Sequence, residues 1–469
     1  MKNFHVYMGR LFCIVALLSF TYSCSKDNGP LALSDLCSIT SVTIGKADNS
    51  SFSKDGYTLV SGNIIYATLP LGAGLTSVNM NISASAGATV AINGVGSTDG
   101  RVTANLSGLV NIEVTSESGR KSDYILLAHN GHDELDKFVY AFMKRFSIPG
   151  ISVAFSKQES VLYTKGIGFA EVASRTRVEP GTLFRLASVS KQFTTMCIMK
   201  LYEAGKLTIE DKVFGVGGVL ESEFTSVSPM ASRVTVKHLL EHTSGWTSDP
   251  DPMFTTSFKG QTLDQRIQYV LGSEQREPGT RNSYFNMGFG ILGKVVEKLS
   301  GKEFEVYLKE VLAEAGIGDV HIGGDLSQRR ANEAVYYSQD GANGYGNEMD
   351  VIAAAGGVIA STEEMTKLLF HIDGFTGIPD IIKPETRQLM LTPSTVYDRY
   401  ALCWRINHQY FPNACFHTGN LAGTAVMWVM GNDMNCIVLC NSRSYISGFD
   451  DELYGLLRDL RDAAIGMNL

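Results

Sequence analysis

A serine and a lysine stand one helical turn apart in the stretch FRLASVSKQF, which runs from residue 184 to 193. The apolar residues that follow have helical spacing, so Ser188 is predicted near a helix N-terminus, where free backbone N–H groups favour a developing negative charge on oxygen. Lys191 would project from the same face of this helix. If burial lowers the pKa of Lys191, its neutral amine can take the serine proton and make Ser188 a nucleophile. The alternative is a serine cap beside an exposed lysine, and this motif alone does not exclude it.

Two later stretches favour the catalytic interpretation. The first, from residue 278 to 288, contains a Tyr-x-Asn motif formed by Tyr284 and Asn286. The second, from residue 415 to 420, has the sequence CFHTGN and enters a predicted strand. Its candidate site residues are His417, Thr418, Gly419 and Asn420.

In this order, the Ser-x-x-Lys, Tyr-x-Asn and His-Thr-Gly motifs resemble those of the serine β-lactamase and penicillin-binding-protein superfamily. The resemblance is closest to the class C and DD-peptidase-like branch of that superfamily. Residues 168–172, 234–246 and 354–362 support it, and it covers roughly residues 133–469. It implies an α+β fold, a β-lactamase/transpeptidase-like domain in which helices flank an antiparallel sheet and a helical subdomain is attached. It is specific for the fold and much less specific for the substrate.

The resemblance also implies how the first two motifs share the reaction. Ser188 would attack a carbonyl carbon and become acylated. Lys191 and Tyr284 would share the work of the general base, and Tyr284 would protonate the leaving group. A phenol is a poor base unless nearby cations lower its pKa, which we expect of Lys191 and His417. Asn286 would hold the amide side chain of the substrate.

The third motif would complete the site that the resemblance implies. The backbone N–H groups of Ser188 and Asn420 would form an oxyanion hole, in which the loss of one donor typically costs about 10²–10³ in rate. Thr418 would bind a substrate carboxylate. Gly419 has no side chain and would let the substrate approach the strand edge. His417 is expected to belong to the site and not only to the strand.

Three departures from the usual family pattern bear on the substrate. His417 stands where β-lactamases usually have a lysine, and a histidine is charged only part of the time near neutral pH. The residues Arg-Leu-Ala at 185–187 replace the Glu-x-Gly that is typical of class C enzymes. Ala401 and Cys403 stand where glycines are usual. The core machinery remains, but hydrolysis of β-lactam antibiotics becomes the less favoured prediction.

We therefore expect a serine hydrolase that forms an acyl-enzyme and needs no metal or cofactor. Its substrates would be D-amino-acid peptides of cell-wall type, or small amides and esters. A β-lactamase with the same machinery is one alternative. Another is a surface binding protein whose hydrolase fold is a relic, although replacement of Ser188, Lys191 or Tyr284 would be the expected trace of such a change.

The N-terminal residues predict export. The basic residues Lys2 and Arg10 precede an apolar run at 11–20 that is too short to span a bilayer. This pattern is typical of a signal peptide, here over residues 1–23. Its end resembles a bacterial lipobox with Cys24 as the lipidated residue, and a plain signal peptide is the alternative. We expect a lipid-anchored protein of the bacterial cell envelope, in the periplasm or on the outer-membrane surface. The net charge of −8, without a Lys/Arg block, gives no electrostatic footprint for nucleic acid.

A separate domain is predicted after a tether over residues 24–36. Residues 37–129 are rich in Ser, Gly, Thr, Val and Asn, with alternating apolar and polar runs at 79–83 and 110–115. Frequent turns between such runs indicate a small β-sandwich. The stretch loosely resembles the immunoglobulin-like domains that precede catalytic domains in some bacterial surface lipoproteins, which implies a spacer or an adhesive module.

The elements predicted for residues 133–469 come from distant parts of the chain. A helix with one apolar face is expected over residues 133–146, followed by strands at 151–155 and 161–164. After a long helical middle, the C-terminal part predicts four strands and one helix, at residues 400–406, 414–417, 425–430, 436–440 and 450–464. This order indicates one α+β domain whose sheet is completed by segments far apart in the sequence.

Two further patterns are weak. His238 and His242 match the inverted zinc-protease motif His-x-x-Glu-His. A Thr-Ser-Gly turn follows at once and no third ligand can be identified, so no metal site is predicted. Cys403 and Cys415 flank a predicted hairpin and are candidates for a disulfide.

Overall fold

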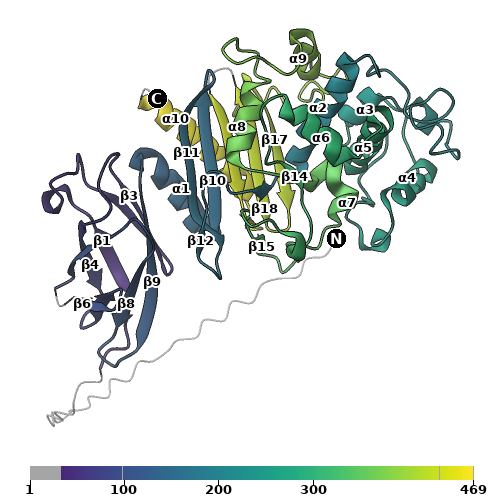
Figure 1. Ribbon diagram of the computed structural model, residues 1–469. Coiled ribbons are helices and arrows are strands. Elements are labelled where there is room, and N and C mark those ends of the chain that lie inside the picture. The colour runs from purple at the N-terminus through teal and green to yellow at the C-terminus, as the bar shows by residue number, and fades with distance from the viewer. Residues whose placement is uncertain (1–32, 98, 432–433, 468–469) are drawn as a thin grey trace, which may run out of the picture.

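Six antiparallel strands from distant parts of the chain form the central sheet of the computed structural model (Figure 1). From one edge to the other they are β12 (Thr176–Arg177), β11 (Ser160–Glu171), β10 (Gly150–Lys157), β19 (Asn435–Cys440), β18 (Thr424–Gly431) and β17 (Ala414–Leu421). The α+β fold is confirmed, and so is the completion of its sheet by distant segments, since Ile151 of β10 pairs with Cys440 of β19. β17 is the edge strand that matters for the site.

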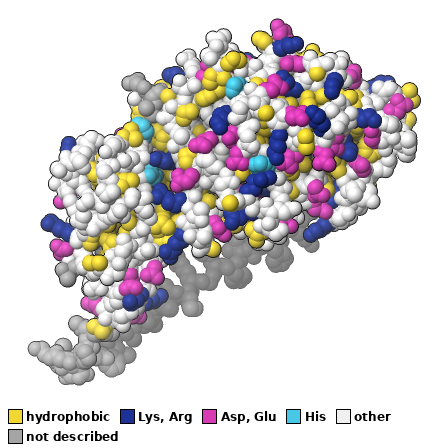
Figure 2. All heavy atoms as spheres, viewed as in Figure 1, with side chains coloured by type: hydrophobic (Ala, Val, Ile, Leu, Met, Phe, Trp, Pro, Cys, Tyr) yellow, Lys and Arg dark blue, Asp and Glu magenta, His cyan; other side chains and the backbone are white. Residues whose placement is uncertain are grey.

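The structure describes residues 33–467 apart from 98 and 432–433. The predicted signal peptide and the predicted lipidation site Cys24 lie outside the described residues, as does most of the predicted tether. Within the described ranges, no helix is long and apolar enough to cross a membrane. On the face shown in Figure 2, acidic and basic side chains are interspersed over the larger domain.

Two helices cover one face of the central sheet, α1 (Asp133–Phe146) and α10 (Phe449–Gly466). The apolar residues of α1 recur every three or four positions, so they form one stripe that is buried against the sheet. Phe142 and Phe146 lie with their ring centres 5.6 and 5.0 Å from that of Phe449. The first and the last helix of the domain therefore pack against each other.

The opposite face carries α2 (Ser190–Glu203) and α8 (Thr362–Phe370), beyond which the helical subdomain lies. The other helices are α3 (Val236–Leu240), α4 (Leu263–Gly272), α5 (Asn286–Ser300), α6 (Phe304–Ala313), α7 (Met349–Ile352) and α9 (Pro384–Leu391). Short helical turns are η1 (Lys46–Asp48), η2 (Ala187–Val189), η3 (Ala231–Arg233), η4 (Thr256–Phe258), η5 (Leu326–Gln328) and the π-helical η6 (Ala353–Gly357). Most of α2 is buried, because it lies between β18 and α5.

Two small sheets connect these parts. The first joins β13 (Phe184–Arg185), β16 (Val358–Ala360) and β14 (His321–Ile322). The second pairs β15 (Tyr337–Ser338) with β20 (Ser442–Arg443).

The N-terminal strands form two sheets around a core of their own. The smaller sheet has the order β1 (Ile39–Thr43), β4 (Val78–Ala84) and β7 (Arg101–Ala104). The larger sheet has the order β2 (Tyr57–Ser61), β3 (Ile64–Leu69), β9 (Lys121–Asn130), β8 (Val110–Thr115), β5 (Thr89–Ile92) and β6 (Val95–Ser97). Alternate residues of β8 are buried in the shared core, as a sandwich requires. The likeness to immunoglobulin domains stays a prediction.

A buried carboxylate joins the two domains. Asp136 of α1 has no exposed side-chain area, and its Oδ2 accepts hydrogen bonds from Thr68 of β3 and His129 of β9, both at 2.8 Å. Tyr163 of β11 donates to the other carboxylate oxygen. Burial alone would raise the pKa of Asp136, but the hydrogen bonds outweigh it and hold the pKa below the ordinary value. The N-terminal domain is therefore bound to the larger one by a paired, buried charge.

Two sequence predictions are wrong at one place. Residues 400–406 form a turn instead of a strand, in which Tyr400 and Arg405 make an isolated bridge. Cys403 has a φ of 67°, in the left-handed region, and so interrupts the extended backbone that a strand needs. Cys403 and Cys415 form no disulfide; both are buried free thiols.

Candidate active site

The segment that carries Ser188 is held between β16 and β17. The backbone N–H of Leu186 donates to the carbonyl of Val358 at 2.9 Å. On the other side, a Cβ added to Gly419 would stand only 2.1 Å from the carbonyl oxygen of Leu186. Gly419 is thus required by the close approach of β17 to this segment, which is a different reason from the expected approach of a substrate. Ser188 lies half-buried in η2, directly before α2, where backbone N–H groups lack intrahelical acceptors.

Lys191 lies in the first turn of α2 and is completely buried, which excludes the alternative of an exposed lysine. Its Nζ is 3.1 Å from Ser188 Oγ and 2.7 Å from the carbonyl oxygen of Ala355 in η6. Burial lowers the pKa of Lys191 to about 7, because a buried ammonium loses its hydration. Near neutral pH roughly half of this amine is therefore uncharged and lies within reach of the Ser188 proton.

Tyr284 approaches the same amine from the helical subdomain. The centre of its ring lies 5.0 Å from Lys191 Nζ, and its hydroxyl is buried without a hydrogen-bond partner among the described residues. Burial raises the pKa of Tyr284, and its interaction with Ser188 opposes this only in part. The expectation that neighbouring cations lower this pKa is therefore wrong. A neutral phenol suits the role of proton donor and leaves the role of general base to Lys191.

The backbone of β17 turns one edge toward these groups. Phe416 exchanges two backbone hydrogen bonds with Arg405 across this edge, both at 2.9 Å. Backbone groups alternate along an antiparallel strand, so those of Thr418 and Asn420 point the same way as those of Phe416. The η2 turn with Ser188 packs against this strand. The Asn420 N–H thus points to the open edge of β17, the strand against which the turn with Ser188 packs.

His417 is buried and neutral. Its Nδ1 donates to the carbonyl of Thr418 at 2.7 Å, so its Nε2 accepts from the Tyr400 hydroxyl at 3.2 Å. Burial, together with the charges of Arg405 and Lys191, lowers the pKa of His417 well below its ordinary value. His417 can therefore orient Tyr400, but it cannot supply the positive charge of the lysine that it replaces.

The two histidines of the zinc-protease pattern have separate structural roles. His238 Nδ1 accepts from the backbone N–H of Thr235 in the capping box of α3. His242 Nδ1 accepts from the backbone N–H of Phe285 at 3.1 Å, and its ring centre lies 4.3 Å from that of Tyr284. The described residues contain no cluster of three or more side chains that could hold a metal ion. His242 thus positions the Tyr-x-Asn segment.

Asn286 and Thr418, which are both predicted to bind the substrate, also contact protein side chains. Asn286 begins α5, and its amide nitrogen donates to Asp251 at 2.7 Å. Thr418 is half-buried on the face of β17 opposite to His417 and interacts with Tyr454; burial raises the pKa of Tyr454, and the Thr418 hydroxyl opposes this rise. Both side chains would have to share these contacts with a substrate.

A cavity of about 430 Å³ opens beside the Tyr284 side chain. Its lining includes His242, Arg281, Asn282, Tyr284, Tyr400 and Arg405. Two of these residues are arginines, and none of the residues in the lining is acidic. The cavity therefore suits a substrate that carries a negative charge close to the bond that reacts.

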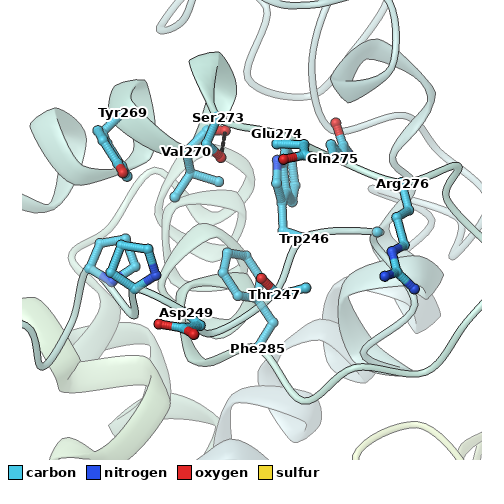
Figure 3. Close-up of a pocket in the computed structure, with 13 residues that line it drawn as sticks. Trp246, Thr247, Asp249, Tyr269, Val270, Ser273, Glu274, Gln275, Arg276 and Phe285 are labelled. Carbon is cyan, nitrogen blue, oxygen red and sulfur yellow. Dashed lines mark hydrogen bonds between the residues drawn. The ribbon is translucent and has the colours of Figure 1, made fainter.

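A second cavity, of about 420 Å³, lies next to the Tyr-x-Asn segment and is shown in Figure 3. Its aromatic lining residues are Trp246, Tyr269 and Phe285; the ring centres of Trp246 and Phe285 are 5.8 Å apart. Asp249 and Glu274 are also in its lining. None of the side chains proposed to act in catalysis lines it. This cavity adjoins the site without belonging to its reactive part.

Three residues that contribute to the site lie outside the three motifs: Ala355, Tyr400 and Arg405. The Ala355 carbonyl that holds Lys191 has no sequence signal beyond the supporting stretch around it. Tyr400 and Arg405 flank the stretch in which Ala401 and Cys403 replace the usual glycines, and this departure is the one signal that marks them.

Comparison with known proteins finds similarity to β-lactamases and to penicillin-binding proteins. The family model described as Beta-lactamase matches residues 135–458. Protein flp of Staphylococcus aureus (strain N315) is 26% identical over 183 residues, which are 39% of this chain and 36% of that protein. Penicillin-binding protein 4* of Bacillus subtilis (strain 168) is 27% identical over 282 residues, 58% of this chain and 57% of that protein. The matches thus span about a third to just over half of the length of these curated relatives.

Solved structures with a similar fold are also found. The crystal structure of D-alanine carboxypeptidase AmpC from Burkholderia cenocepacia matches with a TM-score of 0.57 and 19% identity, over 69% of this chain and 97% of that chain. At this identity the likeness concerns the fold.

Proposed function

The chain belongs to the β-lactamase/transpeptidase-like superfamily of serine hydrolases, and on this premise we propose that it hydrolyses D-amino-acid peptides, small amides or esters through an acyl-enzyme on Ser188. The observation that supports this most directly is the pairing of Ser188 with a fully buried Lys191 at 3.1 Å. A lysine held there with a pKa of about 7 is a base at the pH at which enzymes commonly work.

In the proposed reaction, Lys191 takes the proton of Ser188 as the serine oxygen bonds to the substrate carbonyl carbon. The carbonyl oxygen becomes negative between the N–H groups of Ser188 and Asn420. When the carbonyl re-forms, Tyr284 gives its proton to the leaving group and recovers one from protonated Lys191. A water molecule then attacks the acyl-enzyme and gives a proton to Lys191, which returns one to the departing Ser188 oxygen.

The proposed substrates carry a carboxylate near the reacting bond, as peptides that end in a D-amino acid do. His417 is neutral, so the positive charge for this group would come from Arg405 and Arg281 in the cavity beside Tyr284. We expect Arg405→Met to raise KM for a carboxylate substrate about 10–100-fold, the worth of a hydrogen bond to a charged group. An ester without the carboxylate should lose little. Arg399→Met is the matched control, because Arg399 is exposed and not in the lining of the cavity.

Export and lipid anchoring at Cys24 belong to the same proposal. They are supported by the sequence of the first residues, and mass spectrometry of the N-terminus of the protein from a membrane fraction tests them. A diacylglycerol-modified Cys24 is the expected result, and an unmodified N-terminus at another residue would refute the anchor.

Intact-mass spectrometry over time tests the reaction. Benzylpenicillin is mixed with protein that lacks residues 1–24, and Ser188→Ala is the control. A stable adduct that depends on Ser188 supports a DD-peptidase type with slow deacylation, whereas a short-lived adduct with accumulating hydrolysed penicillin supports the β-lactamase alternative. If no adduct forms, esters and D-peptides are assayed next, and turnover that persists in Ser188→Ala would refute the mechanism.

A further inference from the structure

Arg443 makes a set of contacts at the end of β17 that the three motifs do not include. Its Nη1 donates to Oδ1 of Asn420 at 2.5 Å. The same guanidinium binds both carboxylate oxygens of Asp450, at 2.8 and 3.0 Å. It also lies over the rings of Tyr445 and Phe449, at 5.8 and 5.3 Å from their centres. Arg443 is thus a fixed link between the edge strand β17 and the first turn of α10.

Asn420 needs such a link because of its place in the strand. It is exposed, and it is the second residue before the β17–β18 turn at 422–423. Its backbone N–H points to the open edge of β17, where no strand among the described residues pairs with it. The side-chain contact with Arg443 is the tie that the structure provides at this residue.

We propose that Arg443 is a positioning residue of the oxyanion hole, which holds the Asn420 side chain so that the Asn420 N–H keeps its direction toward the carbonyl oxygen of the substrate. The inference rests on the proposed function, since it assigns Asn420 the second oxyanion donor. Asp450 in turn positions Arg443. The oxyanion donor is in this way tied to the C-terminal helix, on the opposite side of the sheet from α2.

The contacts of Arg443 differ from those of an ordinary surface ion pair. An exposed pair holds two flexible side chains and contributes little, but the Arg443 side chain is only 17% exposed. It combines a two-pronged carboxylate contact with aromatic packing, and a planar guanidinium keeps such geometry better than an ammonium can. The link is therefore rigid enough to fix a backbone group, and a displacement of about 1 Å at a reacting centre can cost about 10²-fold in rate.

The test compares a phenyl ester of an N-acyl-D-alanine with its thionoester, in which sulfur replaces the carbonyl oxygen. Sulfur is a weak hydrogen-bond acceptor, so the thionoester profits little from an oxyanion hole. Wild type and Ser188→Ala are assayed first with the ester. The variants Arg443→Met, Asn420→Ala and their combination then follow, with Arg458→Met as the matched control. Arg458 lies on α10, the helix that Arg443 binds through Asp450, but it is exposed and pairs with its neighbour Asp459.

Arg443→Met is expected to lower kcat on the ester about 10–100-fold, with KM changed less than about twofold. The thionoester should lose much less. Asn420→Ala keeps the backbone N–H and removes only the anchored side chain, so it should show the same pattern, and the double variant should be no slower than the worse single one. Arg443→Lys should restore part of the rate, and Arg458→Met should behave as wild type.

An unchanged kcat in Arg443→Met, an equal loss on both substrates, or additive losses in the double variant would each overturn the inference while the proposed function stands. Ester turnover that survives in Ser188→Ala would instead overturn the proposed function and this inference with it. If Arg443→Met does not fold, as judged by thermal unfolding, Asn420→Ala alone decides by the ratio of its two substrate rates.

Discussion

Replacement of Lys191 by Met should abolish turnover and at the same time stabilise the protein at neutral pH. The side chain is fully buried, and burial lowers its pKa from 10.5 to about 7. At about 1.4 kcal/mol per pH unit, keeping this lysine buried costs about 4–5 kcal/mol at pH 7. Met removes that cost but leaves the carbonyl of Ala355 without its donor, which costs about 1–3 kcal/mol. Subtracting the second cost from the first gives a net gain in the free energy of unfolding of about 1–4 kcal/mol, centred near 2–3 kcal/mol.

The gain should depend on pH in a defined direction. The pKa of Lys191 is depressed in the folded protein, so between pH 7 and 10.5 the unfolded chain binds more protons and wild-type stability rises with pH. The advantage of Lys191→Met is therefore largest at pH 7 and below, and it should vanish by about pH 9.5. With an unfolding entropy of about 2.1 cal/mol/K per residue, 2–3 kcal/mol corresponds to about 3–4 °C in Tm for a domain of this size.

Calorimetry at pH 7 and pH 9.5 measures this difference, with Lys200→Met as the control. Lys200 lies on the same helix but is 18% exposed and paired with Glu314, so its removal should give no gain at either pH. In parallel, kcat/KM of the wild type should rise with pH through an inflection near 7. A lower or equal Tm for Lys191→Met at pH 7, together with a flat pH–rate profile, would refute the neutral-lysine mechanism.

Other variants test separate parts of the structure. Tyr284→Phe removes the neutral proton donor and should lower kcat about 10²–10⁴-fold, with the inflection near pH 7 retained. When Tyr284→Phe is combined with Lys191→Ala, the loss of activity should be smaller than the sum of the two single losses, because the two residues act as a unit. Ala187→Gly should raise the free energy of unfolding by about 0.5–1 kcal/mol in chemical denaturation, since Ala187 has a φ of 48° that costs a residue with a Cβ about 1–2 kcal/mol; no gain would mean that the turn before Ser188 is unstrained. Asp136→Ala removes the acceptor that Thr68, His129 and Tyr163 share and should destabilise the protein by about 3–5 kcal/mol, with the N-terminal domain unfolding separately in calorimetry. A single unshifted transition would contradict the role of Asp136 in joining the two domains.

The fold was predictable where a local pattern settles the structure. The stripe of apolar residues over 133–146 gives α1 with its observed bounds, and the C-terminal run at 436–440 gives the buried strand β19. The pattern fails at residues 400–406, where a largely apolar run predicts a strand but Cys403 adopts a left-handed backbone. That conformation is imposed by tertiary contacts, among them the hydrogen bond from Cys403 N–H to the carbonyl of Leu240.

The sequence also does not predict how the two domains contact each other. Asp136 reads as one more acidic residue in the first turn of a helix, where negative charge is favourable. Its partners Thr68, His129 and Tyr163 come from three strands, and nothing in their local sequence marks them as one cluster. The sequence therefore predicts a spacer, whereas the contacts describe a domain that is firmly attached.

For the site, the motifs predict which residues meet but not their charges. Ser188, Lys191 and Tyr284 come together as the resemblance implies. Protonation depends on burial, which residue type and spacing do not specify. Burial makes Lys191 a base near pH 7, but it keeps the Tyr284 phenol neutral, opposite to the expectation from nearby cations.

The neutrality of His417 connects the departures that the sequence shows around it. A permanent cation at this position would lie beside a base whose pKa is already about 7 and would lower that pKa further, because like charges disfavour protonation. The neutral His417 ring does not lower the pKa of Lys191 in this way, because its two nitrogens are hydrogen-bonded to Tyr400 and to the Thr418 carbonyl. The turn around Cys403 brings Tyr400 to that ring and Arg405 to the cavity beside Tyr284. The edge strand therefore carries no positive charge at His417, and Arg405 supplies positive charge in the lining of the cavity.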